Sequence, residues 1–92
     1  MRHLDNDYTS YLAGKFPRIC YDIYCGACFP DTWEAIIVTT LQEINDLQVD
    51  IQISQIKSKI GRLRIYFDSP LTEIELEPVR ALIRKAEALT AP

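Results

Sequence analysis

The sequence predicts an α+β domain in which helices pack on one face of a small antiparallel sheet. An apolar–polar alternation of period two on both sides of Gly61 predicts a central β-hairpin at about residues 48–68. Apolar residues at helical spacing predict one helix before the hairpin, at about 32–46, and one after it, at about 78–89. The 92 residues, 48% of them hydrophobic and 25% charged, suffice for one core and are too few for two. We therefore expect residues 1–92 to form a single domain.

A further short helix is predicted at about residues 5–16. Asp5 or Asn6 can cap its first turn, because a short polar side chain accepts hydrogen bonds from the free backbone N–H groups there. Gly14 and Pro17 indicate its end, since neither residue favours continuation of a helix.

The segment 18–24 allows two interpretations. Ile19, Tyr21 and Ile23 alternate as in a strand, but Ile19 and Ile23 also lie one helical turn apart. We favour a helical or irregular conformation. A turn-rich loop at 25–30, with one glycine and one proline, is expected to follow.

The helix at about 32–46 has a clear helical pattern. Asp31 and Glu34 resemble a capping box, with carboxylates at the positive end of the helix dipole. The apolar stripe that follows consists of Trp33, Ile37, Leu41 and Ile44. Trp33 is compatible with ligand stacking, but its place in this stripe favours the core.

Within the hairpin we expect strands at about 48–56 and 62–68. The apolar parity slips between Ile53 and Ile56, which predicts a bulge or the end of a strand near Gln55. In the second strand, the apolar face consists of Leu63, Ile65 and Phe67. The same alternation places Arg62, Arg64 and Tyr66 on the opposite face.

The segment 72–77 alternates again and is predicted to form a third, extended strand. Thr72 and Glu75 could instead open a helix, but Pro78 would then fall in its second turn and remove a backbone hydrogen bond. We therefore place Pro78 at the first position of the last helix, at about 78–89.

The candidate partner- or nucleic-acid-binding residues lie in the hairpin: Lys57, Lys59, Arg62, Arg64 and Tyr66. No acidic residue lies among the four cations. The chain before residue 54 has three basic and eight acidic side chains, and the chain after residue 64 has three and five. Guanidinium groups suit bidentate contact with phosphate or carboxylate, ammonium groups act as point charges, and a tyrosine ring offers a stacking plane. The alternative is that these charges only solvate an exposed sheet face.

The net charge of −3 argues against general coating of nucleic acid, since the field of the whole molecule repels phosphate. A local basic patch still acts at contact range, because salt screens charges beyond about 8–10 Å.

The three cysteines, Cys20, Cys25 and Cys28, are weak candidates for a metal site. Cys25 and Cys28 have the C-x-x-C spacing that can bind zinc or carry redox chemistry. A zinc site needs a fourth ligand, and the one histidine, His3, lies near the N-terminus. A redox motif normally follows a strand in a βαβ unit, which the sequence does not suggest. We favour plain thiols and expect no cofactor.

The sequence offers little for catalysis, so we expect a protein that is not an enzyme. It contains no Gly-rich phosphate loop, no G-x-S-x-G and no H-E-x-x-H. No apolar run of about 18 residues predicts a membrane helix, and the polar first residues do not resemble a signal peptide. The expected location is therefore the cytoplasm.

The hairpin sequence from Gln55 to Tyr66 resembles a motif of small uncharacterised phage and prophage proteins. That motif is approximately Gln-Val-Lys-Glu-Lys-Phe-Gly-Gly-Leu-Arg-Phe-Tyr. The likeness covers most of residues 25–90, with Trp33 and the helix at 78–89 in matching places. This chain departs from the family at Ser58, Ile60, Arg62 and Thr32, where the family has Glu, Phe, Gly and Gly.

The chain also resembles small phage-encoded anti-CRISPR proteins that inhibit type I-F surveillance complexes. This second resemblance rests on size, acidic charge and the lack of catalytic motifs. It implies a stoichiometric inhibitor that docks on the Cas subunits around the guide RNA, in the host cytoplasm, and blocks binding of target DNA. The clustered cations favour contact with guide RNA over mimicry of DNA. The alternative is a small phage or bacterial housekeeping domain that binds zinc or a modest ligand.

Overall fold

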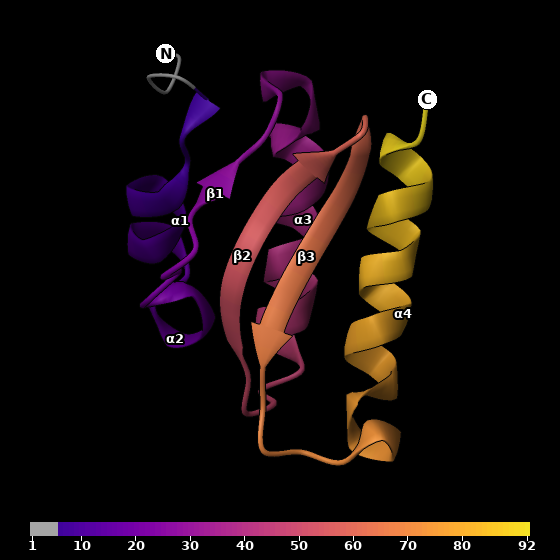
Figure 1. Cartoon of the computed structure of the whole chain (residues 1–92). Helices are drawn as coiled ribbons and strands as arrows, with labels where there is room; N and C mark the ends of the chain where they lie inside the picture. Colours follow the sequence, from indigo (N-terminus) through magenta and orange to yellow (C-terminus); the bar gives the residue numbers. More distant parts are fainter. Residues whose placement is uncertain (1–5) are drawn as a thin grey trace.

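The computed structural model describes residues 6–92 and has the α+β architecture that the sequence predicts (Figure 1). Along the chain the elements are α1 (Thr9–Lys15), α2 (Pro17–Cys20), β1 (Ala27–Cys28), the 3-10 helix η2 (Asp31–Trp33), α3 (Glu34–Asp46), β2 (Gln52–Lys59), β3 (Arg62–Asp68) and α4 (Glu73–Thr90). None of the helices within these residues is long and apolar enough to cross a membrane.

The sheet has three strands in the order β1-β2-β3 and is mixed rather than antiparallel throughout. The predicted hairpin is the antiparallel β2–β3 pair, in which Ile56 lies opposite Ile65 and Lys57 opposite Arg64. The third strand is β1, which runs parallel to β2 with Ala27 beside Ile56. β2 is the central strand, so β3 is an edge strand that pairs with β2 on one side only.

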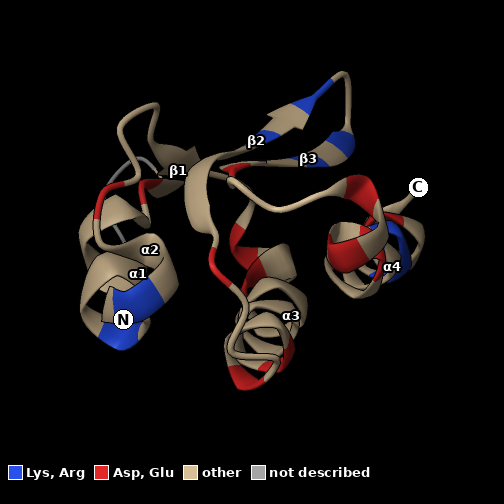
Figure 2. Ribbon diagram, turned by 90° about the horizontal axis from the view of Figure 1, so that it is seen from below, with Lys and Arg blue, Asp and Glu red and all other residues tan. Residues whose placement is uncertain are grey.

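All the helices lie on one face of the sheet, which leaves its other face open (Figure 2). The strands send alternate side chains into the space between sheet and helices. The buried side chains there include Ile56, Leu63 and Ile65 from the sheet and Ile37 and Leu41 from α3, and they form one continuous core. Trp33 packs against this core and is half-buried, in agreement with its predicted place in the helix stripe.

The bulge predicted near Gln55 is confirmed. Ile53 pairs with Phe67 and Gln55 with Tyr66, so Ser54 is the extra residue on β2. Ser54 is buried, and its carbonyl accepts a hydrogen bond from the backbone N–H of Cys25 at 3.0 Å. The bulge therefore restores the apolar parity of β2 and also attaches the segment before β1 to the sheet.

The prediction of a third strand at 72–77 is wrong, because these residues form the beginning of α4. Thr72 caps the helix: its hydroxyl accepts from the Glu75 backbone N–H at 3.3 Å, and the Glu75 carboxylate accepts from the Thr72 N–H at 3.1 Å. Pro78 lies inside α4, where it removes the bond to the carbonyl of Ile74. Ile74 is on the exposed side of the helix, so water can satisfy that carbonyl, while Leu76 extends the buried stripe.

The N-terminal predictions need three corrections. The helix expected at 5–16 is the shorter helix α1, whose N-cap residue is Tyr8 rather than Asn6. Asp5 lies outside the described residues, and Pro17 begins a separate helix, α2. The loop expected at 25–30 contains β1. Asp31 does not cap the helix at 32–46: it accepts hydrogen bonds from Asn6, at 2.9 Å, and from the hydroxyl of Tyr8. The favoured helical or irregular conformation of 18–24 agrees with α2 and the turns after it.

Candidate functional site

The hairpin places all five predicted site residues on the open face of the sheet. In β3, Leu63 and Ile65 are buried, whereas Arg62 and Tyr66 are exposed and Arg64 is half-buried. The strand pairing places Lys59 beside Arg62 and Lys57 beside Arg64. The four cations therefore form two cross-strand pairs at the turn end of the hairpin, where Figure 2 shows basic residues and no acidic ones.

These two pairs are unfavourable for folding. Residues directly opposite each other in an antiparallel pair have Cβ atoms about 5 Å apart, and like charges at that distance destabilise the sheet. Among residues 6–92, no carboxylate forms an ion pair with Lys57, Lys59 or Arg62. Arg64 is partly engaged: its Nη1 donates to the Leu63 carbonyl at 2.9 Å and lies 3.9 Å from the Glu87 carboxylate of α4.

Tyr66 adds an aromatic ring beside the cations. It lies opposite Gln55 in the sheet and is 41% exposed. The ammonium of Lys57 lies 5.8 Å from the centroid of its ring, which is within the range of a cation–π contact. The hairpin thus combines positive charge with an accessible ring.

The turn at the tip of the hairpin is unusual for its sequence. Its two residues, Ile60 and Gly61, have φ of 53° and 75°, as a type I′ turn requires. Asn, Asp or Gly normally occupies the first of these positions, since a β-branched side chain there clashes with its own backbone. Ile60 is nevertheless present and is 93% exposed. The tip therefore presents an apolar side chain between Lys59 and Arg62.

Two tyrosines that the sequence did not identify as site residues extend the open face. The hydroxyl of Tyr24 donates to the Asp68 carboxylate at 2.7 Å, and that of Tyr21 donates to the Gln52 side chain at 2.6 Å. Tyr24 and Tyr21 are 60% and 62% exposed. The bond to Asp68 raises the pKa of Tyr24. Both lie in the ambiguous segment 18–24, and no local pattern indicates that this segment continues alongside β2.

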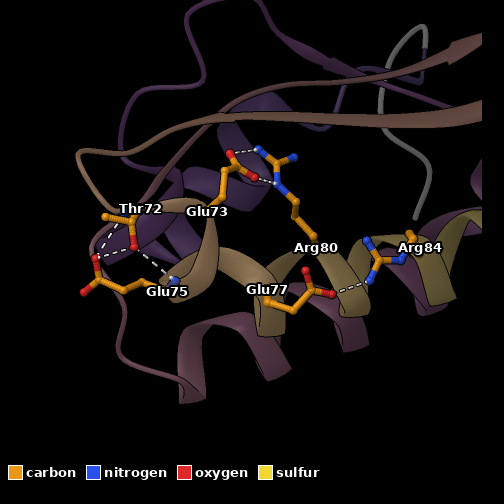
Figure 3. A network of polar contacts seen from close by, with 6 residues as sticks. All are labelled: Thr72, Glu73, Glu75, Glu77, Arg80 and Arg84. Atoms are coloured by element: carbon orange, nitrogen blue, oxygen red, sulfur yellow. Dashed lines mark hydrogen bonds and ion pairs between the residues drawn. The ribbon is translucent and has the colours of Figure 1, made fainter.

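A cleft of about 260 Å³ lies between β3 and α4 and borders the open face. The arginines that line it are Arg64, Arg80 and Arg84. Arg80 forms two hydrogen bonds with Glu73, at 2.8 and 3.0 Å, and Arg84 bonds Glu77 at 2.7 Å (Figure 3). The bond to Arg80 holds the pKa of Glu73 below its ordinary value. These α4 cations are therefore neutralised by neighbours on their own helix, unlike those of the hairpin tip.

The structure does not bring the three cysteines together as a metal site. Cys20 is buried in α2, and burial raises the pKa of its thiol to about 12, so it stays protonated. Cys25 lies just before β1 and Cys28 is the last residue of β1, and both are exposed. Within residues 6–92, no three histidine, cysteine or acidic side chains are grouped so as to hold a metal ion. His3 lies outside the described residues.

Comparisons with protein-family models, with curated proteins and with solved structures give no match to this chain.

Proposed function

We propose that this protein is a non-catalytic binding protein that holds the phosphate backbone of a nucleic acid on the open face of its hairpin. The observation that carries the proposal is the pair of like-charge contacts, Lys57 with Arg64 and Lys59 with Arg62. They destabilise the free protein. A phosphate that contacts both cations of a pair on the open face would replace their mutual repulsion with attraction to the phosphate. A face that only needed solvation would gain stability by mixing charges across the strands.

The chemistry of the face favours phosphate. Arg62 and Arg64 offer planar forks for bidentate contact, and Lys57 and Lys59 add mobile point charges. The remainder of the chain is acidic, so a negatively charged partner is attracted at the hairpin and repelled elsewhere. The uneven distribution of charge therefore orients the partner as well as attracting it.

The proposed target is the guide RNA of a type I-F CRISPR surveillance complex and the Cas subunits around it. The support for this target is the resemblance to phage-encoded anti-CRISPR proteins, whereas the support for phosphate binding is the geometry of the hairpin. In this proposal the protein acts stoichiometrically in the host cytoplasm and blocks binding of target DNA. It needs no cofactor.

A charge-matched pair of variants tests the proposal. Lys59→Gln with Arg62→Gln removes two charges from the hairpin, and Arg84→Gln with Lys85→Gln removes two from α4. Each protein is titrated into labelled RNA and into the purified surveillance complex at several salt concentrations, after circular dichroism has confirmed folding. We expect the hairpin variant to lose about tenfold or more in affinity. Its salt dependence should flatten by about 0.7–0.9 units of log–log slope per lost contact.

The α4 variant should bind as the wild type does, because its cations already pair with glutamates. Equal losses in the two variants would mean that only net charge matters. Absence of binding to RNA and to the complex by the wild type would reject the proposal altogether.

A further inference from the structure

The open face continues beyond the cations as a surface of exposed tyrosine rings. From the tip of the hairpin downward, the cross-strand pairs are Lys59 with Arg62, Lys57 with Arg64, Gln55 with Tyr66, and Gln52 with Asp68. The positive charge is therefore confined to the end nearest the turn. The other end carries rings, amides and one carboxylate, which do not suit phosphate.

The position of Tyr24 follows from its hydrogen bonds. The next residue, Cys25, donates its backbone N–H to Ser54 of β2, so Tyr24 lies beside the outer edge of that strand. Its hydroxyl nevertheless reaches Asp68 on β3, at 2.7 Å. The ring must therefore cross β2, and its 60% exposure places it on the open face, since the core fills the other one.

Tyr24 and Tyr66 both lie on this face. Tyr66 and Asp68 point to the same side of β3, two residues and hence about 7 Å apart. Since Asp68 accepts a hydrogen bond from the hydroxyl of Tyr24, that hydroxyl lies one same-face position away from Tyr66, and the Lys57–Arg64 pair lies on the other side of Tyr66. Proteins bind single strands on surfaces that combine cations with exposed rings, with phosphates on the charges and bases on the rings.

We propose that the open face binds single-stranded RNA, with its bases stacked on Tyr66 and Tyr24 and its phosphates on the hairpin cations. This inference rests on the proposed function and narrows it, because bases inside a duplex are not free to stack on side chains. Asp68 favours RNA over DNA. Tyr24 donates to its Oδ2, and none of residues 6–92 donates to its Oδ1, which can therefore accept from a 2′-hydroxyl that DNA lacks.

The test measures anisotropy of a labelled eight-nucleotide oligouridine, of single-stranded DNA of the corresponding sequence, and of a duplex RNA of equal length. The variants are Tyr24→Leu and Tyr66→Leu, which remove a ring, and Tyr24→Phe, which keeps the ring and loses the bond to Asp68. Tyr24 is 60% exposed and Tyr66 is 41% exposed, and neither belongs to the buried core, so folding should be retained; circular dichroism checks it.

The wild type should prefer the single-stranded RNA to both other probes. Each ring removal should weaken binding of that RNA by about five- to hundredfold. It should leave the salt slope unchanged, because stacking releases no counterions, whereas the hairpin charge variant flattens the slope. Tyr24→Phe should stay within about threefold of the wild type, since its stacking plane remains.

Two results would overturn this inference while leaving the proposed function intact: tight duplex binding, or ring variants that bind single-stranded RNA as the wild type does while the charge variant does not. Equal affinity for DNA and RNA would remove the role given to Asp68. An unchanged charge variant would instead reject phosphate binding, which is the proposed function itself.

Discussion

The β2–β3 hairpin and helix α4 both expose basic side chains, but they differ in what lies opposite each charge. In α4, Arg80 faces Glu73 and Arg84 faces Glu77. In the hairpin, basic residues face one another across the strands. The helix also begins with a complete capping box, whereas the hairpin turn holds Ile60 at a positive φ.

Helix α4 thus follows most of the local rules that favour stability, and the hairpin departs from two of them. Departures of this kind concentrate at functional sites, where another requirement outweighs stability. Exposure alone therefore does not identify a binding surface. What distinguishes the hairpin is the positive charge of Lys59 and Arg62 at its tip, which no carboxylate of residues 6–92 neutralises and which costs folding stability.

The two faces of the hairpin should differ strongly in what they contribute to folding. Leu63→Ala should lower the free energy of unfolding by about 2–5 kcal/mol, because Leu63 is buried and its truncation leaves a cavity. Arg62→Ala, the matched change one residue away on the open face, should alter it by no more than about 0.5 kcal/mol. Urea denaturation of both variants measures the difference. Similar losses would show that the open face contributes to folding as the covered face does.

The turn provides the next test, with the opposite sign. Ile60→Asn should raise the free energy of unfolding by about 1 kcal/mol, because asparagine tolerates the left-handed conformation that isoleucine adopts only at a cost. Ile60→Val keeps the β-branch and serves as the control, with no gain expected. Thermal melts of the three proteins compare them. A loss of stability in Ile60→Asn would mean that the exposed side chain makes favourable contacts within the protein.

At the start of α4, Thr72→Ala should cost about 1 kcal/mol by removing the helix cap. The hydrogen bonds from Thr72 lower the pKa of Glu75. A lowered folded-state pKa stabilises the protein above the ordinary value of 4.5 and loses this effect as the pH falls through the lower value.

The loss caused by Thr72→Ala should therefore be larger at pH 7 than at pH 3. Thr72→Ser keeps the hydroxyl and should resemble the wild type at both values. Denaturation at the two pH values measures this, and a loss in Thr72→Ala that does not depend on pH would contradict the role of Glu75.

The sequence was sufficient where structure follows from local pattern. Period-two alternation predicted the hairpin, its bulge near Gln55 and the side of β3 on which Arg62, Arg64 and Tyr66 lie. Helical spacing likewise predicted the buried stripe of α3, with Ile37, Leu41 and Ile44. These features depend on neighbours in the chain, so their signal is contained within each segment.

Features set by distant contacts were missed or misassigned. A two-residue strand such as β1 has no periodicity of its own, and its pairing with β2 depends on residues about thirty positions away. Tyr24 joins the open face through Asp68, which lies 44 residues further on. For residues 72–77 the sequence offered two signals, a capping box and Pro78, and we gave more weight to the proline. In the structure the residues are helical, because the hydrogen bonds of Thr72 and the burial of Leu76 more than offset the one backbone bond that proline removes.

Lys59→Glu should change stability and binding in opposite directions. It turns the like-charge pair with Arg62 into an attractive one, so the free energy of unfolding should rise by about 0.2–1 kcal/mol. Affinity for RNA should fall, since a phosphate contact is lost and a negative charge is added. Lys85→Glu is the matched control in α4, where it breaks the pair with Glu43 and should lower stability slightly while leaving binding unchanged. We predict that Lys59→Glu makes the protein more stable and weakens its binding. Unchanged binding, or a loss of stability, would contradict the proposal that the hairpin keeps unfavourable charge because a partner requires it.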